Sequence, residues 1–243
     1  GSEMCIRDSP NVGKSTLFNA LTKSNSAQAA NFPFCTIDPN IGEVMVPDHR
    51  LIELSKISVS KETIPTKMTF IDIAGLVKGA SKGEGLGNKF LANIRECDAL
   101  AHVTRCFEDE NVTHVNNVID PVADIDIINT ELLLADLESV TKQIESFKKR
   151  SGKKNDEVLS LAFLEKVMEL LESGIPIRQG VFLEDELKML RLSQFLTSKP
   201  ILFICNVDEN SIKAGNEYSK KVEALAKTLK APTLNISVSI EQE

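Results

Sequence analysis

A short glycine–lysine–serine segment near the start of the chain constrains its fold more than any other feature. Residues 10–16 (PNVGKST) are followed by an apolar run, residues 17–21, that is compatible with a helix. Backbone N–H groups at the start of a helix, a lysine and a hydroxyl group together form a common cradle for a phosphate chain and its Mg²⁺ ion. Gly13, Lys14 and Ser15 supply these groups in the required order. The segment therefore predicts the second half of a phosphate-binding loop.

The first half of that loop departs from the usual pattern. A glycine normally stands five residues before Gly13, where this chain has Asp8. Residues 1–9 also differ from the buried apolar strand that usually leads into such a loop, because Arg7 and Asp8 place two charges at its end. Two alternatives remain open: the segment is a truncated or altered start, or the first strand is unusual.

Length and composition fit one large domain, or one domain with an insert. The chain has 243 residues, of which 42% are hydrophobic and 26% charged, enough for a sizeable core. The net charge of -7 argues against a surface that is basic all over, so we expect only local RNA contacts and no sequence-specific DNA contact. The five cysteines are scattered without a C-x-x-C pair, which favours reduced thiols. With no apolar run of membrane-spanning length and no signal peptide, we expect a cytoplasmic monomer without membrane contact.

A second motif follows the strand-like residues 68–72 (MTFID). Asp72 and Gly75 have D-x-x-G spacing, so the carboxylate is placed to hold Mg²⁺ through water and the glycine N–H to approach a γ-phosphate. Thr36, in the loop of residues 32–37, has the position of a switch threonine that completes the Mg²⁺ shell while the γ-phosphate is present. The structural alternative for both motifs is a surface turn.

The residue that would orient the attacking water is not evident from the motifs alone. Leu76 occupies the position where Ras-like enzymes place a glutamine, and an apolar side chain cannot orient water. His102 lies within the strand-like residues 98–107, where a core role is expected. His114 lies in the loop beyond that strand and remains a candidate for positioning water.

The middle of the chain changes to a helical pattern. Apolar residues recur three and four positions apart over residues 133–147 and again over residues 161–171, which predicts an antiparallel helical hairpin of coiled-coil character. The turn between the two helices is basic, and it is either solvated or a contact for a phosphate backbone. Its basic residues are Lys148, Lys149, Arg150, Lys153 and Lys154.

The α/β pattern resumes after the hairpin. Residues 200–205 and 234–237 are strand-like, with a helical pattern over residues 212–229 between them. We therefore predict a three-layer α/β phosphate-loop domain formed by residues 1–123 and 200–243, with an inserted helical coiled-coil region, residues 124–199.

Three stretches make the sequence similar to the Obg-like ATPase (YchF) family of P-loop NTPases. They are residues 10–16, 31–40 and 72–91, and the resemblance continues to the C-terminus. The resemblance implies a P-loop NTPase domain with a coiled-coil insert. Family members also carry a C-terminal TGS domain, and this sequence stops before the position where that domain would begin. It further implies ATP and Mg²⁺ as ligands and the ribosome as partner.

The resemblance also assigns roles to individual residues. The phosphate cradle is formed by Asn11, Val12, Gly13, Lys14, Ser15 and Thr16. The Mg²⁺ ligands are Ser15 and Thr36, together with Asp72. The base pocket contains Val207 and Ser237, with Asn206 and Glu209. His114 takes the place of the missing glutamine, Gly75 and Lys14 face the γ-phosphate, and Asn11 matches an asparagine that binds K⁺ in some related NTPases.

The segment 206–209 (NVDE) gives a physical reason for ATP. Guanine-specific relatives have Asn-Lys-x-Asp, in which the aspartate accepts two hydrogen bonds from guanine and the lysine stem covers the ring. Glu209 is one methylene longer than aspartate and Val207 is shorter than lysine, so the bidentate grip on guanine is displaced. An adenine amine would instead bond to Asn206 or to a backbone carbonyl.

We therefore predict a Mg²⁺-dependent, ribosome-associated ATPase with a slow intrinsic rate. One alternative is a binding module that keeps the fold and holds nucleotide poorly because of Asp8 and Leu76. A further alternative is a GTP switch, which Glu209 disfavours.

Overall fold

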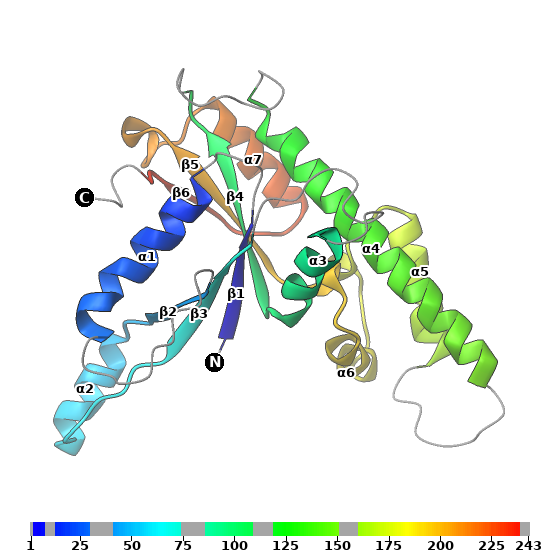
Figure 1. The fold of residues 1–243 in the computed structure, drawn as a ribbon, viewed down its shortest axis with the longest axis horizontal. Helices are drawn as coiled ribbons and strands as arrows, with labels where there is room; N and C mark the ends of the chain where they lie inside the picture. The colour runs from blue at the N-terminus through cyan, green and yellow to red at the C-terminus, as the bar shows by residue number, and fades with distance from the viewer. Residues whose placement is uncertain are drawn as a thin grey trace.

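The computed structural model describes residues 2–7, 13–29, 41–73, 86–108, 119–150 and 160–238. Its centre is a six-stranded sheet in the order β2-β3-β1-β4-β5-β6 (Figure 1). Neighbouring strands are parallel except β2, which runs antiparallel to β3. The strands are β1 (Ser2–Arg7), β2 (Ile41–Met45), β3 (Lys67–Asp72), β4 (Ala99–Cys106), β5 (Ile201–Val207) and β6 (Thr233–Ile236).

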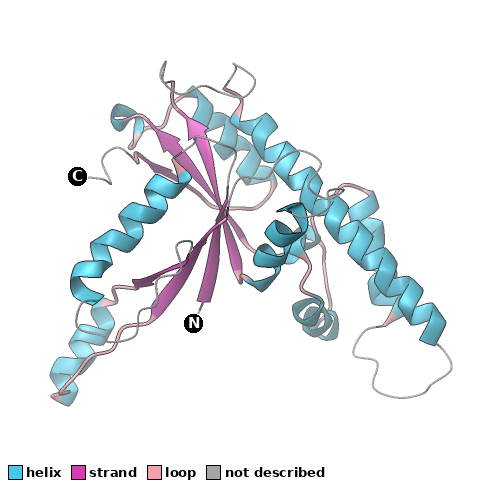
Figure 2. Cartoon of the chain, in the orientation of Figure 1, coloured by secondary structure: helices cyan, strands magenta, loops and turns pink. Residues whose placement is uncertain are grey.

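Helices cover both faces of this sheet (Figure 2). The α-helices are α1 (Lys14–Ala29), α2 (His49–Ser58), α3 (Leu86–Glu96), α4 (Pro121–Arg150), α5 (Leu161–Glu172), α6 (Glu184–Ser193) and α7 (Glu217–Thr228). Three short 3-10 helices, η1 (Ile177–Gln179), η2 (Leu196–Ser198) and η3 (Glu209–Ser211), join them. The result is the three-layer α/β fold that the sequence predicts.

Two apolar clusters hold the layers together. On one face, Leu17 and Phe18 of α1 pack with Ala101 and Val103 of β4 and Ile204 of β5. On the other face, buried side chains of α3, the first half of α4 and α7 pack with alternate residues of the same two strands. Because side chains of a strand alternate between faces, β4 and β5 serve both clusters.

Strand β1 has a central place in the sheet. It lies between β3 and β4 and is parallel to both, with Ile6 opposite Asp72 and Arg7 opposite His102. Backbone hydrogen bonds on both edges hold such a strand without requiring a particular side chain. Residues 2–7 therefore form a central strand although their sequence departs from the usual apolar pattern.

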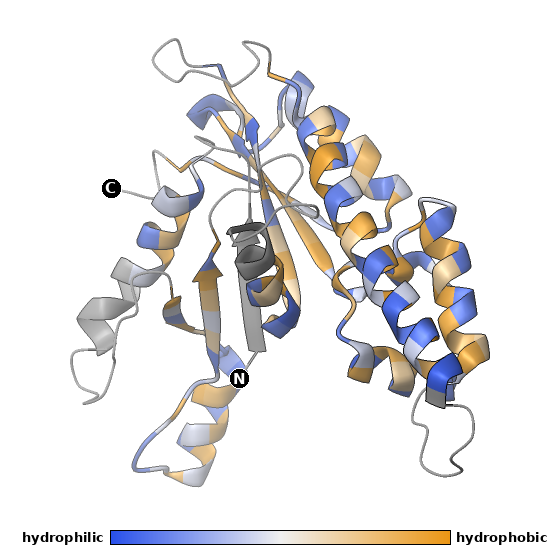
Figure 3. Cartoon of the chain, turned by 45° about the vertical axis from the view of Figure 1, so that its right-hand side comes forward, coloured by the Kyte–Doolittle hydropathy of each residue, from blue (hydrophilic) through white to orange (hydrophobic). Residues whose placement is uncertain are grey.

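The helical region has its own core. Val140 and Ile144 of α4 pack against four buried residues of α5, and Ile177 and Phe195 extend the same cluster. The two helices lie side by side, with hydrophobic residues running along both (Figures 1 and 3). Long helix α4 thus takes part in two cores, because Ile125 and Leu132 near its start pack in the sheet cluster.

A buried carboxylate fixes α4 to the segment that leads into β5. Asp136 accepts hydrogen bonds from Leu196 N (2.8 Å), Thr197 N (2.7 Å) and Thr197 Oγ1 (2.8 Å). Burial raises the pKa of Asp136, although these three donors and Arg95 oppose the shift. Arg178 lies nearby with its Nη1 3.4 Å from Thr197 O, and burial lowers its pKa to about 10.

The structure bears on two further features considered in the sequence, the state of the cysteines and the length of the apolar helices. In the described part of the chain, Cys106 and Cys205 are buried free thiols, whereas Cys97 is disulfide-bonded. The expectation of reduced thiols is therefore wrong for Cys97, because sequence spacing does not reveal which sulfur atoms meet in space. None of the helices in the described ranges is long and apolar enough to cross a membrane.

Candidate nucleotide-binding site

Three residues from two distant motifs meet at the carboxyl edge of the sheet. Lys14 and Ser15 begin α1, and Asp72 ends β3. Lys14 Nζ forms an ion pair with Asp72 Oδ1, and Ser15 Oγ donates to Asp72 Oδ2 at 2.9 Å. The side chains of Lys14 and Asp72 are only 11% and 12% exposed. The structure thus brings together the predicted phosphate lysine and the predicted Mg²⁺ ligands Ser15 and Asp72.

Gly13 is constrained in two ways. Its φ of +89° is in the left-handed region, which side chains other than glycine rarely adopt. A Cβ at this position would also lie 2.7 Å from Asn206 Nδ2. Gly13 O in turn accepts the first helical hydrogen bond of α1, from Leu17 N at 2.9 Å. The turn into α1 is therefore built around a residue without a side chain.

Asn206 connects three parts of the site. It lies near the end of β5, is only 4% exposed, and its Oδ1 accepts a hydrogen bond from Val238 N at 3.1 Å. Its Nδ2 faces Gly13, as the close approach to that glycine shows. The side chain therefore braces the start of α1 against the chain that follows β6.

The remaining residues predicted for the base pocket lie around the ends of β5 and β6. Val207 is buried in the cluster beneath α7, and Ser237 is buried just after β6. Glu209 is exposed at the start of η3. Between them, Asp208 accepts from Ser211 Oγ at 2.7 Å, which lowers the pKa of this carboxyl together with Asn216.

Of the other residues predicted for the site, the structure describes only Thr16. Thr16 is partly buried in the first turn of α1. Asn11, Val12, Thr36, Gly75 and His114 lie outside the described residues, as do Asp8 and Leu76.

The donor set suits a hard cation. Mg²⁺ prefers oxygen ligands and is usually held by one or two protein groups together with substrate phosphates. The Ser15 hydroxyl and the Asp72 carboxylate are 2.9 Å apart and provide such oxygens. Within the described ranges, no group of three or more His, Cys, Asp or Glu side chains is arranged to hold a metal alone.

One charged residue at this edge, Arg105, was not predicted from the sequence. Arg105, at the end of β4, is only 3% exposed, and its Nε donates to Phe107 O at 3.1 Å. Its guanidinium carbon lies 5.0 Å from the centroid of the Phe107 ring. The signal in the sequence that could have identified Arg105 is a basic residue within an otherwise buried strand, residues 98–107.

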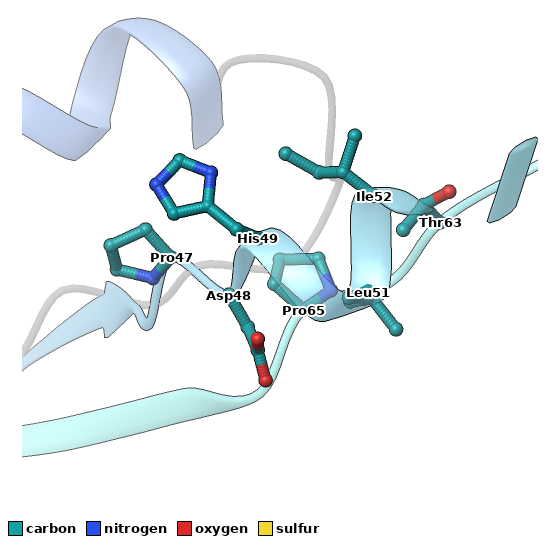
Figure 4. A pocket seen from close by; sticks show the side chains of 7 residues that line it. All are labelled: Pro47, Asp48, His49, Leu51, Ile52, Thr63 and Pro65. Carbon is teal, nitrogen blue, oxygen red and sulfur yellow. The ribbon is translucent and has the colours of Figure 1, made fainter. Parts of the chain in front are cut away.

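An apolar cavity of about 240 Å³ lies away from this edge (Figure 4). It adjoins α2, at the end of α1 opposite to Lys14 (Figure 1). None of the residues predicted for the site lines it; its walls are Pro47, Asp48, His49, Leu51, Ile52, Thr63 and Pro65.

The parallel sheet, the glycine turn into α1 and the lysine–aspartate pair define a P-loop NTPase domain. The family model described as "50S ribosome-binding GTPase" matches residues 4–160. The chain is 49% identical over 237 residues to the "Ribosome-binding ATPase YchF" of Bacillus subtilis, covering 96% of this chain and 64% of that relative. The protein of the same name from Haemophilus ducreyi is 52% identical over 236 residues, with the same coverage.

A solved structure supports the same assignment. The "Structure of the Schizosaccharomyces pombe YchF GTPase" superposes with a TM-score of 0.81 at 36% identity, covering 99% of this chain and 66% of that one. The chain belongs to the YchF family, within the P-loop proteins that the family model represents. It spans 64% of the length of the curated relatives that it matches.

Proposed function

We propose that this chain binds ATP with Mg²⁺ and hydrolyses it slowly, as part of a ribosome-associated ATPase. The observation that carries the proposal is the meeting of Lys14, Ser15 and Asp72 at the carboxyl edge of the sheet. The names of the bacterial relatives, which are ribosome-binding ATPases, support the same function.

The residues of the chain supply the binding chemistry. Lys14 Nζ, held by Asp72 in the structure, would turn to the β- and γ-phosphates, since a triphosphate carries more negative charge than one carboxylate. The N–H groups around Gly13, with those of Asn11, Val12 and Thr16, would surround the phosphate chain. Bound Mg²⁺ would neutralise charge on the phosphate oxygens, and Ser15, Thr36 and Asp72 would hold it.

Hydrolysis also requires a water that is oriented toward the γ-phosphate. Because Leu76 cannot orient it, we assign this role to His114, with Gly75 N–H contacting the γ-phosphate. Asn11 is our proposal for a K⁺ ligand. With a loop histidine in place of a glutamine, we expect a slow intrinsic rate that a partner increases.

Our proposal of ATP over GTP rests on the segment after β5. The names of relatives differ here: the bacterial proteins are called ATPases and the yeast structure a GTPase. Asn206 Oδ1 already accepts from Val238 N, so of the two acceptors considered for the adenine amine we favour a backbone carbonyl. Glu209, Val207 and Ser237 would then shape the pocket rather than read guanine.

We propose the ribosome as partner and divide the work between two regions. Residues 1–123 and 200–243 would bind nucleotide, and the inserted residues 124–199 would contact the partner while the chain remains a monomer. The Asp136 contacts to Thr197 would transmit a movement of α4 to β5, which carries Asn206. Co-sedimentation with purified ribosomal subunits, with ATP and without it, tests this division.

Calorimetric titration with ATP, GTP and a non-hydrolysable ATP analogue, with Mg²⁺ and with a chelator, tests the proposed nucleotide. We expect ATP and its analogue to bind with Mg²⁺, and GTP to bind at least about tenfold more weakly. Lys14→Ala should abolish binding, whereas Lys67→Ala, which removes an exposed partner of Glu43, should not. Equal affinity for GTP would favour the switch, and undetectable binding of every nucleotide would favour the binding module.

A further inference from the structure

The segment between β5 and α7 is closed on itself by hydrogen bonds. Ser211 Oγ donates to Asp208 Oδ2 at 2.7 Å, and Ser211 N donates to Asp208 O at 3.0 Å. Gly215 N in turn donates to Ser211 O at 2.8 Å. Glu209, one of the residues proposed for the base pocket, begins η3 inside this closed segment. A contact that fixes the segment to the sheet therefore also fixes the backbone of Glu209.

Asn216 connects this segment to the end of β4. Its Nδ2 donates to Cys106 O at 2.6 Å and to Asp208 Oδ2 at 3.5 Å. Cys106 ends β4 and is the register partner of Val207, another residue proposed for the base pocket. One amide group thus joins the neighbouring strand to the carboxylate that directly precedes Glu209.

The same side chain caps α7. Asn216 Oδ1 accepts from Ser219 N at 3.0 Å, and Asn216 N donates to Ser219 Oγ at 2.8 Å. Aspartate caps a helix about as well as asparagine does. A carboxylate has no hydrogen to donate, however, whereas the amide has two N–H donors besides its oxygen. The two bonds to Cys106 O and Asp208 therefore go beyond what a cap requires.

We propose that Asn216 is a positioning residue for the base pocket. By holding Asp208 against the end of β4, its amide fixes the direction in which Glu209 leaves the sheet, and with it the distance from Glu209 to the base. This role rests on the proposed function, in which Glu209 and Val207 shape a pocket for adenine. It concerns the base and not the phosphates that Lys14 would bind. The role therefore predicts a change in nucleotide preference and not a general loss of binding.

The test separates the donor role of Asn216 from its cap. Asn216→Asp keeps a good N-cap but turns an oxygen toward Cys106 O and Asp208. The matched control is Ser160→Ala, which removes the cap of α5, where Ser160 Oγ accepts from Phe163 N at 3.1 Å. Dissociation constants of ATP and GTP are measured by competition with a fluorescent ATP analogue, and folding is measured by melting temperature.

We expect Asn216→Asp to weaken ATP binding about fivefold or more, the effect of about one lost hydrogen bond, and to weaken GTP binding less than about twofold. Ser160→Ala should lower the melting temperature and leave both affinities within about twofold. The double variant Asp208→Asn/Asn216→Asp exchanges donor and acceptor across the pair. In a double-mutant cycle, Asp208→Asn should therefore raise ATP affinity more in the Asn216→Asp chain than in the unmodified chain.

Three results would overturn the role. They are a loss for GTP as large as that for ATP in folded Asn216→Asp, ATP affinity within about twofold of the unmodified chain, and an equal effect of Asp208→Asn in both chains of the cycle. If Asn216→Asp does not fold, Asn216→Ser, which keeps a cap without adding charge, decides by the same comparison of ATP with GTP. If the unmodified chain binds no nucleotide, or binds ATP and GTP equally, it is the proposed function that fails, before any variant is compared.

Discussion

Ser15 Oγ donates a 2.9 Å hydrogen bond to Asp72 Oδ2, although the two residues are 57 positions apart in the sequence. The other oxygen of the same carboxylate holds Lys14 Nζ. Asp72 thus joins the start of α1 to the end of β3 and keeps the lysine and the serine at one point. In this structure the Asp72 carboxylate is the negative group beside Lys14, and in the proposed complex a phosphate chain would take that place.

Asp72→Asn should lower the rate of ATP hydrolysis about 10- to 100-fold, since groups that orient metal ligands commonly contribute this much. The amide keeps the shape of the side chain but loses the charge that pairs with Lys14. Steady-state phosphate release at several Mg²⁺ concentrations measures the effect. An unchanged rate and unchanged Mg²⁺ dependence would remove Asp72 from the cation site.

Gly13→Ala should abolish nucleotide binding and destabilise the chain. Alanine would have to adopt a φ of +89° and place its Cβ 2.7 Å from Asn206 Nδ2. We expect a loss of about 1–3 kcal/mol in the free energy of unfolding. Urea denaturation and an ATP titration measure the two effects.

Gly174→Ala is the matched control for this variant. Gly174 also has a positive φ, +70°, but a Cβ there would have no neighbour within 4 Å. The control should lose about 1 kcal/mol and keep its ATP affinity. Equal behaviour of the two variants would mean that the contact with Asn206 has no role in the site.

Glu209→Asp should shift the nucleotide preference toward guanine. Glu209 is exposed at the start of η3, so shortening it by one methylene changes the base contact with little effect on the core. The guanine-specific relatives have lysine at the position of Val207, but Val207 is only 2% exposed in the core. Val207→Lys would bury a charge, so the test uses Glu209→Asp alone. The ratio of the ATP to the GTP dissociation constant should rise, because GTP binding strengthens relative to ATP binding. An unchanged ratio would mean that Glu209 does not contact the base.

Asp136→Asn should destabilise the chain by about 2 kcal/mol. The carboxylate accepts from Leu196 N and from both donors of Thr197, and an amide would turn an N–H group toward one of them. ATP affinity should change less than stability, since Asp136 lies away from Lys14 and Asp72. Urea denaturation at fixed pH measures the loss.

The difference in stability between the unmodified chain and Asp136→Asn should also depend on pH. Because burial raises the pKa of Asp136 in the folded chain, the folded state retains this proton at pH values where the unfolded carboxyl has lost it. Its contribution to stability therefore falls as pH rises from the ordinary aspartate value through the raised one. The stability gap between the unmodified chain and Asp136→Asn should narrow over this window. A gap that widens with pH would contradict the raised pKa.

Most of the helices and strands could be predicted from local sequence patterns. The strands around residues 68–72, 98–107 and 200–205 and the helical hairpin are confirmed, because their apolar periodicity is strong. The predicted helix over residues 212–229 begins only at Glu217. Asn216 accepts from Ser219 N at 3.0 Å and donates to Ser219 Oγ at 2.8 Å, a capping box that sets the start.

Other elements depend on partners that local sequence does not show. Strand β1 is held by register with β3 and β4 on both edges. Helix α2 was not predicted; it begins where Asp48 accepts from Arg50 N at 2.9 Å and has no buried residue to mark its face. The lysine–aspartate site follows from motif spacing, whereas the approach of Asn206 to Gly13 and the place of Arg105 depend on strand register.

The most direct test of the central claim is ATP hydrolysis by the unmodified chain and by Lys14→Ala. Phosphate release is measured with Mg²⁺, alone and with ribosomal subunits, and Lys67→Ala serves as the control for a lost surface lysine. We predict slow release by the unmodified chain and the control, faster release with the partner, and no release above background by Lys14→Ala. Equal release by Lys14→Ala and the unmodified chain would contradict the claim that Lys14, Ser15 and Asp72 form the site of an ATPase.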